Sequence, residues 1–222
     1  MLRMSDDPRD EPSWARRQHG VTYLVWALLG IAAGGSAWVG NWATAFVALA
    51  TFALTLLPIL AQDWTGVRLP AGFVGAVAVF IVGTLFLGEV GDFYERFWWW
   101  DVLMHSGSAV GFGMIGTVLV LLIVRGDRLR APPFLGGLLA FTFAVAIGAL
   151  WEIFEYTMDQ VFGLNMQKSG LRDTMWDLIV DCVGGLVGAL AGYGYLRGRG
   201  GGRLARVIAR FVEDNLHRRD GA

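Results

Sequence analysis

Long apolar stretches alternate with short polar segments along this chain. No Asp, Glu, Lys or Arg occurs between Val21 and Gln62, and a membrane-spanning helix needs about 20 mostly apolar residues. That run is long enough for two spans, which a turn at Gly40 and Asn41 would separate. The same pattern along the whole chain predicts six transmembrane helices, at 21–39, 42–60, 70–88, 98–124, 133–158 and 174–196.

The predicted fold is therefore all-α, a polytopic membrane bundle over residues 21–196. Residues 1–20 are a polar N-terminal segment, and residues 197–222 are a basic tail. Hydrophobic residues are 55% of the 222 and charged residues 17%, against about 25% charged in soluble domains. This composition excludes an ordinary soluble domain and a disordered chain. A net charge of -1 argues against nucleic-acid binding, and the lone Cys182 excludes an internal disulfide.

The distribution of basic residues predicts the orientation. With six spans, fifteen of the 18 Lys and Arg residues fall on the side that carries both termini. Cytoplasmic segments carry this excess, so we expect both termini in the cytoplasm. The tail at 203–217 has an apolar helical face with arginines off that face. It predicts an amphipathic helix, which lies either on an anionic membrane surface or against its own protein.

Ionisable side chains gather in the last three spans. Their spacings of three, four, seven and eight residues put each set on one helical face. The sets are, in chain order, Asp101 and His105, then Glu152, Glu155 and Asp159, then Asp173, Asp177 and Asp181. The predicted topology brings all three to one depth near the external side, within residues 98–181. Gly184, Gly188 and Gly192 continue the last face and predict close helix packing, which also allows a homo-oligomer.

Acids outnumber cations at this level by ten to three. Unpaired charges are costly in a membrane, so the acids must be protonated, paired with cations or bound to a metal. Several carboxylates with one imidazole suit a divalent metal ion whose identity stays open. The expected ligands are Asp101, His105, Glu152, Glu155, Asp177 and Asp181. The alternative is that these acids face the aqueous interface.

The segment between the last two spans has polar side chains that suit an anion such as a phosphate: Asn165, Gln167, Lys168 and Arg172. The alternative is a solvated turn that caps the last span. Both interpretations remain open at the level of the sequence.

Several motifs together resemble one family. They are Trp100-Asp101-Val-Leu-Met-His105, Trp151-Glu152-Ile-Phe-Glu155, Asn165-Met-Gln and Asp173-Thr-Met-Trp-Asp177-Leu-Ile-Val-Asp181. This combination resembles the YjdF-like family of small bacterial inner-membrane proteins, over roughly residues 70–196. A remoter likeness is to VanZ-like membrane proteins. The resemblance implies a multi-pass protein of the bacterial inner membrane and no settled activity. The Asp stripe is also similar to intramembrane metal-dependent lipid transferases, but the signature of the CDP-alcohol phosphotransferases is absent.

The leading functional hypothesis is a metal-binding site at the external ends of the last three spans, with membrane lipids as partners. There it would serve a metal-dependent hydrolase or transferase acting on a lipid or lipid-phosphate. Glu155 or Asp177 would act as the general base. A cation or proton transporter and a structural or accessory protein are the alternatives.

Overall fold

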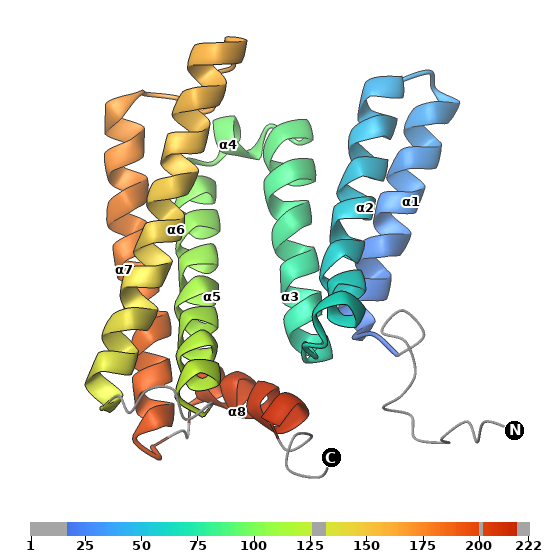
Figure 1. The fold of residues 1–222 in the computed structure, drawn as a ribbon. Coiled ribbons are helices and arrows are strands. Elements are labelled where there is room, and N and C mark those ends of the chain that lie inside the picture. Colours follow the sequence, from blue (N-terminus) through green and yellow to red (C-terminus); the bar gives the residue numbers. More distant parts are fainter. Residues whose placement is uncertain (1–16, 126–131, 200–201, 217–222) are drawn as a thin grey trace, which may run out of the picture. The chain divides into compact units, whose positions relative to one another are not determined.

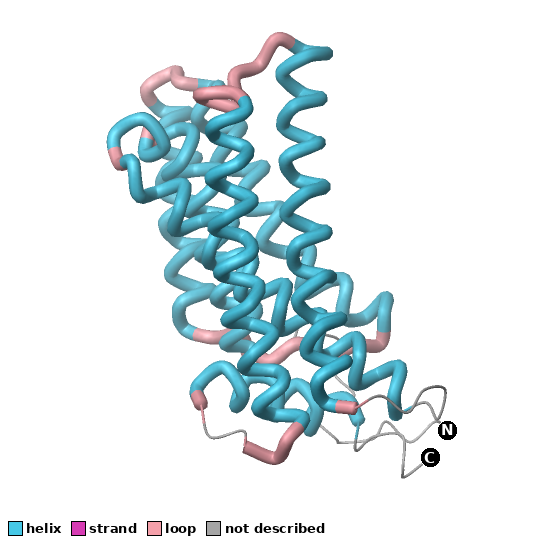
Figure 2. The backbone as a smooth tube through the Cα atoms, turned by 90° about the vertical axis from the view of Figure 1, so that its left-hand side faces the viewer, coloured by secondary structure: helices cyan, strands magenta, loops and turns pink. Residues whose placement is uncertain are grey.

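The structure is a computed structural model that describes residues 17–125, 132–199 and 202–216. Within these ranges the chain forms helices joined by short loops, without strands (Figures 1 and 2). The elements are α1 (Gly20–Trp38), α2 (Trp42–Thr65), α3 (Ala71–Ile81), the π-helix η1 (Val82–Val90), α4 (Phe93–Arg96), α5 (Trp98–Arg125), α6 (Pro133–Phe162), α7 (Leu171–Leu196) and α8 (Arg203–Leu216).

Six of these helices, counting α3 and η1 as one, are long and apolar enough to cross a membrane. The all-α prediction with six spans is thus confirmed. The main differences are at helix ends: α2 and α6 each continue about one turn beyond the predicted span, to Thr65 and Phe162. Of the predicted tail helix, His217 lies outside the described residues.

The first compact unit comprises Met1–Arg96 and Glu213–Ala222. Gly40, with a φ of 77°, makes the tight turn between α1 and α2 that its sequence position predicts. The indole N–H of Trp26 in α1 donates to the Thr55 hydroxyl of α2 at 2.9 Å. Asn215, near the end of α8, is hydrogen-bonded to Arg68 in the loop between α2 and α3. Its side-chain oxygen accepts the backbone N–H of Arg68, and its side-chain N–H donates to the backbone carbonyl oxygen of Arg68. The tail end and that loop therefore lie on one side of the spans.

The third span changes its winding at Val82, where the α-helix becomes the π-helix η1. After η1 the chain turns through Gly91 into the four-residue helix α4. Tyr94 packs so closely on Gly88 that a Cβ atom there would overlap its ring. This largely apolar span gave no sequence signal for the change.

The second unit, Phe97–Val212, contains the three mutually packed helices α5, α6 and α7. Glycines make the contact of α5 and α7 close. A Cβ atom on Gly184 would lie 2.7 Å from the carbonyl oxygen of Ser106, and one on Gly113 would lie 2.8 Å from that of Gly185. Gly188 likewise abuts the carbonyl oxygen of Val110. This is the close packing that the glycine spacing predicts.

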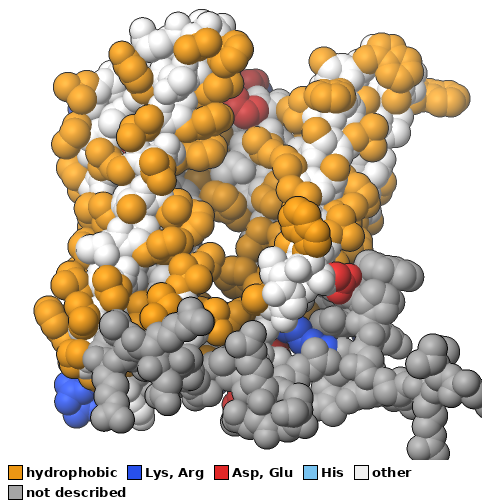
Figure 3. All heavy atoms as spheres, viewed as in Figure 1, with side chains coloured by type: hydrophobic (Ala, Val, Ile, Leu, Met, Phe, Trp, Pro, Cys, Tyr) orange, Lys and Arg blue, Asp and Glu red, His pale blue; other side chains and the backbone are white. Residues whose placement is uncertain are grey.

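Apolar side chains cover much of the outer faces of both units (Figure 3). Ile31 of α1 is 72% exposed and Leu190 of α7 is 56% exposed. Such extensive apolar exposure is typical of helices that face lipid. In α8, Ile208 and Val212 are buried while Arg206 and Arg210 are exposed. Burial of that apolar face favours a tail helix packed against its own protein over one lying on lipid.

Candidate metal centre

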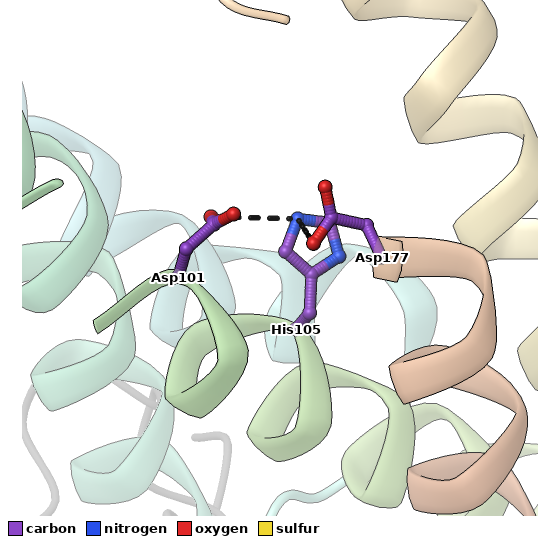
Figure 4. A group of neighbouring side chains, drawn as sticks. All are labelled: Asp101, His105 and Asp177. Carbon is purple, nitrogen blue, oxygen red and sulfur yellow. Dashed lines mark ion pairs between the residues drawn. The ribbon is translucent and has the colours of Figure 1, made fainter. Parts of the chain in front are cut away.

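His105 lies at the centre of a group of acidic side chains from α5 and α7. Its Nε2 atom is 3.8 Å from Oδ1 of Asp101, one turn earlier in α5, and 3.9 Å from Oδ1 of Asp177 in α7. Both carboxylates point toward the ring (Figure 4). On the other side of the ring, Nδ1 is 3.4 Å from Oδ1 of Asp181. Asp101 lies four residues before His105 in α5, and Asp177 lies four residues before Asp181 in α7. The two helical faces that these spacings predict therefore meet at His105.

These residues become more buried with depth in the bundle. The Asp101 side chain is 34% exposed, whereas the side chains of Asp177 and Asp181 are 5% and 3% exposed. Asp101 lies in the first turn of α5, directly after Trp98, Trp99 and Trp100. Trp98 is largely exposed, as expected of an aromatic residue at a membrane interface. The group is therefore accessible from the end of the bundle and closed toward its interior.

One potential ligand atom from each of Asp101, His105 and Asp177 lies within 4.8 Å of the others. Two ligands on one tetrahedral zinc ion lie about 3.3 Å apart. The distances of 3.8 and 3.9 Å from Nε2 would therefore need to shorten by about half an ångström, and the distance between the two carboxylate oxygens, which lie within 4.8 Å of each other, by up to about 1.5 Å. One imidazole and two carboxylates form a donor set that first-row transition metals accept, with further positions left for water or substrate.

Asp181 approaches the opposite ring nitrogen from the one that faces Asp101 and Asp177. Asp181 is also one of the metal ligands expected from the sequence; its Oδ1 lies 3.4 Å from Nδ1, and its role as a ligand stays a prediction. Histidines that bind metals commonly donate their second N–H to such a carboxylate, which fixes the tautomer and the ring orientation. In this arrangement Asp181 would hold the ring of His105 so that Nε2 faces Asp101 and Asp177.

The third helix of this unit, α6, contributes Glu152 to the region around His105. Glu152 is 4% exposed, and in the part of the chain that the structure describes neither carboxylate oxygen has a partner with hydrogen-bond geometry, although the Thr174 hydroxyl is close enough to act on its charge. His105, Asp181 and Asp173 lie close enough to act on its charge. One turn below, Gly148 gives α6 room beside α7, because a Cβ atom there would overlap the Asp181 carboxylate. A buried carboxylate without a partner is costly, so this position calls for a proton or a cation.

Glu155 lies outside the three-residue group. Its Oε1 atom accepts a hydrogen bond of 2.9 Å from the indole N–H of Trp151, one turn earlier, and its side chain is half-buried. Glu152, His105 and Asp101 still act on its charge. Glu155 thus lies beside the group formed by Asp101, His105 and Asp177, and one of its carboxylate oxygens already accepts a hydrogen bond from Trp151.

The loop between α6 and α7 is organised by two acids. The Asp159 carboxylate accepts the backbone N–H groups of Met166 at 2.7 Å and Gln167 at 2.9 Å. Asp173, in the first turn of α7, accepts the N–H of Lys168 at 3.0 Å. These bonds favour the interpretation as a turn that caps α7.

The four side chains predicted to bind an anion divide into two groups. Asn165, Lys168 and Arg172 are exposed on the loop or the start of α7. Gln167 is half-buried, and its Nε2 donates to the hydroxyl of Thr174 at 2.5 Å. The structure therefore does not gather these four side chains into one pocket among the described residues.

The amino-acid sequence matches a known protein family over most of its length. A family model described as "Predicted membrane protein (DUF2238)" matches residues 20–198. The chain belongs to this family. A protein of Thermotoga maritima, described as an uncharacterized protein, is 33% identical over 98 residues, which are 44% of this chain and 50% of the relative. The chain thus spans about half the length of the curated relative it matches. No solved structure matches the chain, and the YjdF-like name and the VanZ-like likeness are not confirmed.

The DUF2238 match covers all six candidate spans, and therefore the whole histidine group. Two neighbours of the site were missed in the sequence analysis. The hydrogen bond from Trp151 to Glu155 could have been predicted, because the two residues are four apart in one helix. The bond that Thr174 accepts from Gln167 could not, because that contact depends on how the loop folds back.

Proposed function

We propose that this DUF2238 protein is a membrane-embedded, metal-dependent hydrolase or transferase that acts on a lipid or lipid-phosphate. The observation that carries the proposal is the approach of Asp101 and Asp177 to one nitrogen of His105, with Asp181 on the other nitrogen. A hydrogen-bonded packing histidine would need one acceptor, whereas this histidine has three carboxylates around it. A divalent cation explains both the surplus of negative charge and the orientation of the ring.

The residues take distinct roles in this proposal. Asp101, His105 and Asp177 hold the metal, and Asp181 positions the imidazole. The metal would supply a Lewis acid that polarises a phosphoryl or carbonyl oxygen. Glu152 is the favoured general base, because its carboxylate is buried and neither oxygen has a hydrogen-bond partner among residues 17–125, 132–199 and 202–216. Glu155 is the second candidate, with one oxygen engaged by Trp151.

A lipid substrate fits the surroundings of the site. Asp101 is partly exposed in the first turn of α5, and the outward faces of the helices are apolar. A headgroup could therefore reach the carboxylates while its acyl chains stay in the bilayer. Lys168 and Arg172 are exposed cations on the neighbouring loop, where they suit a phosphate. We place the site on the external side of a bacterial inner membrane, from the distribution of basic residues and the YjdF-like resemblance.

The seam between α5 and α7 argues for a dead-end site over a transport path. Beyond Asp181, Gly184 and Gly188 bring α7 against the backbone of α5, and Gly113 brings α5 against the backbone of α7. Thr117, further along this seam, is fully buried and bonded to the carbonyl oxygen of Gly113. A cation that enters at His105 would meet closely packed backbone, so the site better suits chemistry than passage.

The test is an activity assay with purified protein. It is reconstituted in mixed micelles with a phospholipid or a lipid phosphate, and release of headgroup or phosphate is measured with and without added Mn²⁺ or Zn²⁺. The proposal expects metal-dependent turnover in the wild type, none in Asp177→Asn, and wild-type rates in Asp63→Ala, since Asp63 belongs to the first unit. Turnover that survives both Asp177→Asn and chelation would refute it.

A further inference from the structure

Polar side chains connect the loop between α6 and α7 with Glu152, the buried carboxylate beside His105. The connection begins at Asp159, near the end of α6, whose carboxylate accepts the backbone N–H of Gln167 at 2.9 Å. The Nε2 atom of Gln167 then donates to the hydroxyl of Thr174 in α7 at 2.5 Å. The Thr174 hydroxyl is in turn close enough to Glu152 to act on its charge. The loop therefore has a polar route to the candidate general base.

The backbone that carries Gln167 is held by both neighbouring helices. Asp159 of α6 also accepts the N–H of Met166 at 2.7 Å, and Asp173 of α7 accepts the N–H of Lys168 at 3.0 Å. Three successive backbone N–H groups, at 166, 167 and 168, are thus bonded to two carboxylates. A backbone held in this way lowers the entropy cost of keeping the Gln167 side chain on Thr174.

The direction of the hydrogen bond from Gln167 to Thr174 leaves the hydroxyl a hydrogen to donate. A threonine hydroxyl has one donor hydrogen and two acceptor lone pairs, and the amide of Gln167 uses a lone pair. Among residues 17–125, 132–199 and 202–216, Thr174 donates to no other group. Glu152 is the buried acceptor within reach of this hydrogen.

We propose that Gln167 and Thr174 are positioning residues for Glu152: the amide of Gln167 directs the Thr174 hydroxyl, and the hydroxyl donates to the Glu152 carboxylate. Such a bond would fix the direction in which the remaining lone pairs of the carboxylate point, which a general base requires. The role of Glu152 as the base rests on the proposed function, whereas the hydrogen-bonded connection does not.

A purely structural role for these two residues predicts a different behaviour. If the bond between Gln167 and Thr174 only closes the loop over the start of α7, its strength is independent of Glu152. If the hydroxyl also donates to Glu152, the two bonds polarise each other, and loss of the carboxylate weakens the bond of Gln167. The side-chain amide of Gln167 therefore reports whether the connection reaches α6.

Nuclear magnetic resonance of the full chain in detergent micelles measures this dependence without substrate or metal. The chain has four glutamines, so with ¹⁵N only in glutamine side chains the Gln167 signal is the one that Gln167→Met removes. Thr174→Val should move this signal, and Thr174→Ser, which keeps the hydroxyl, should leave it near its wild-type position. Glu152→Met should also move it. The control Glu155→Met makes the same charge change one turn later in α6 and should move it much less.

Two other glutamines show whether each variant is folded. Gln62 belongs to the first unit and Gln160 to the second. Their signals should stay in place in every variant, so a shift confined to Gln167 reports the local bond.

Turnover in the mixed-micelle assay is the second readout. Thr174→Val and Gln167→Met should lower kcat about tenfold or more, because a hydrogen bond to a charged group is lost. Their KM and metal affinity should stay within about twofold of wild type, because the metal ligands are unchanged. Thr174→Ser should retain most of the wild-type kcat.

Two results would overturn the proposal. One is a Gln167 signal that responds to Thr174→Val and not to Glu152→Met, because the bond would then only close the loop. The other is an equal response to Glu152→Met and Glu155→Met, which would indicate a general effect of charge. If the wild type shows no turnover while the Gln167 signal follows Glu152, the proposed reaction is wrong and the positioning role stands.

Discussion

Substitution of Gly184 by alanine tests whether close packing of α5 and α7 maintains the geometry of His105. An added Cβ atom would lie 2.7 Å from the carbonyl oxygen of Ser106 and 2.9 Å from Cβ of Ala109, and ordinary contact begins near 3.4 Å. The two helices must therefore separate by roughly half an ångström, and such overpacking typically costs about 1–3 kcal/mol. The same movement would stretch the 3.4 Å contact between His105 and Asp181 beyond hydrogen-bond range.

The assay is reversible unfolding in mixed micelles together with a metal titration. Gly107→Ala is the control, because Gly107 lies in α5, the helix against which Gly184 of α7 packs, and a Cβ atom there would meet nothing within 4 Å. That control should unfold at equal or slightly higher stability, since alanine favours a helix more than glycine does. Gly184→Ala should lose stability and bind metal more weakly. Equal unfolding free energies and equal metal affinities for the two variants would refute the reasoning.

Three further predictions concern the site and the topology. Asp181→Asn should weaken metal binding about 10- to 100-fold, as expected of a group that orients a ligand, while Asp177→Asn should abolish it; equal losses in a titration would contradict the separate roles. Glu152→Gln should raise the melting temperature of metal-free protein, because it removes a buried carboxylate, and it should abolish turnover; a lower melting temperature would contradict the first part. A Ser169→Cys substitution in a Cys182→Ser background should react with an impermeant thiol reagent in intact cells, and labelling only after permeabilisation would reverse the proposed orientation.

The number and approximate positions of the membrane-length helices were predictable because membrane spans have a strong composition signal. The run without charges that ends at Gln62, and the turn at Gly40, fix α1 and the start of α2. The π-helix η1 was not predictable, because a span with so few polar residues has no clear helical period that a change of winding would disturb. The short helix α4 follows directly on this change of winding, and its Tyr94 packs on Gly88 of η1.

For the site, spacing predicted which residues share a helical face but not how the faces meet. The i, i+4 pattern grouped Asp177 with Asp181, yet it could not show that they approach opposite nitrogens of His105. That outcome depends on the rotation and register of α7 against α5. Glu152 and Glu155 differ for a similar reason: one is turned into the bundle, and the other bonds Trp151 beside it.

The central claim is that Asp101, His105 and Asp177 hold a divalent metal ion, and metal analysis of the purified protein tests it most directly. The protein would be stripped of loosely bound metal, analysed for elements, and then titrated with Mn²⁺ and Zn²⁺ beside Asp177→Ala and Asp63→Ala. We expect about one metal ion per chain in the wild type and in Asp63→Ala, and none in Asp177→Ala. No retained metal in the wild type, with no stabilisation by either added ion, would contradict the claim.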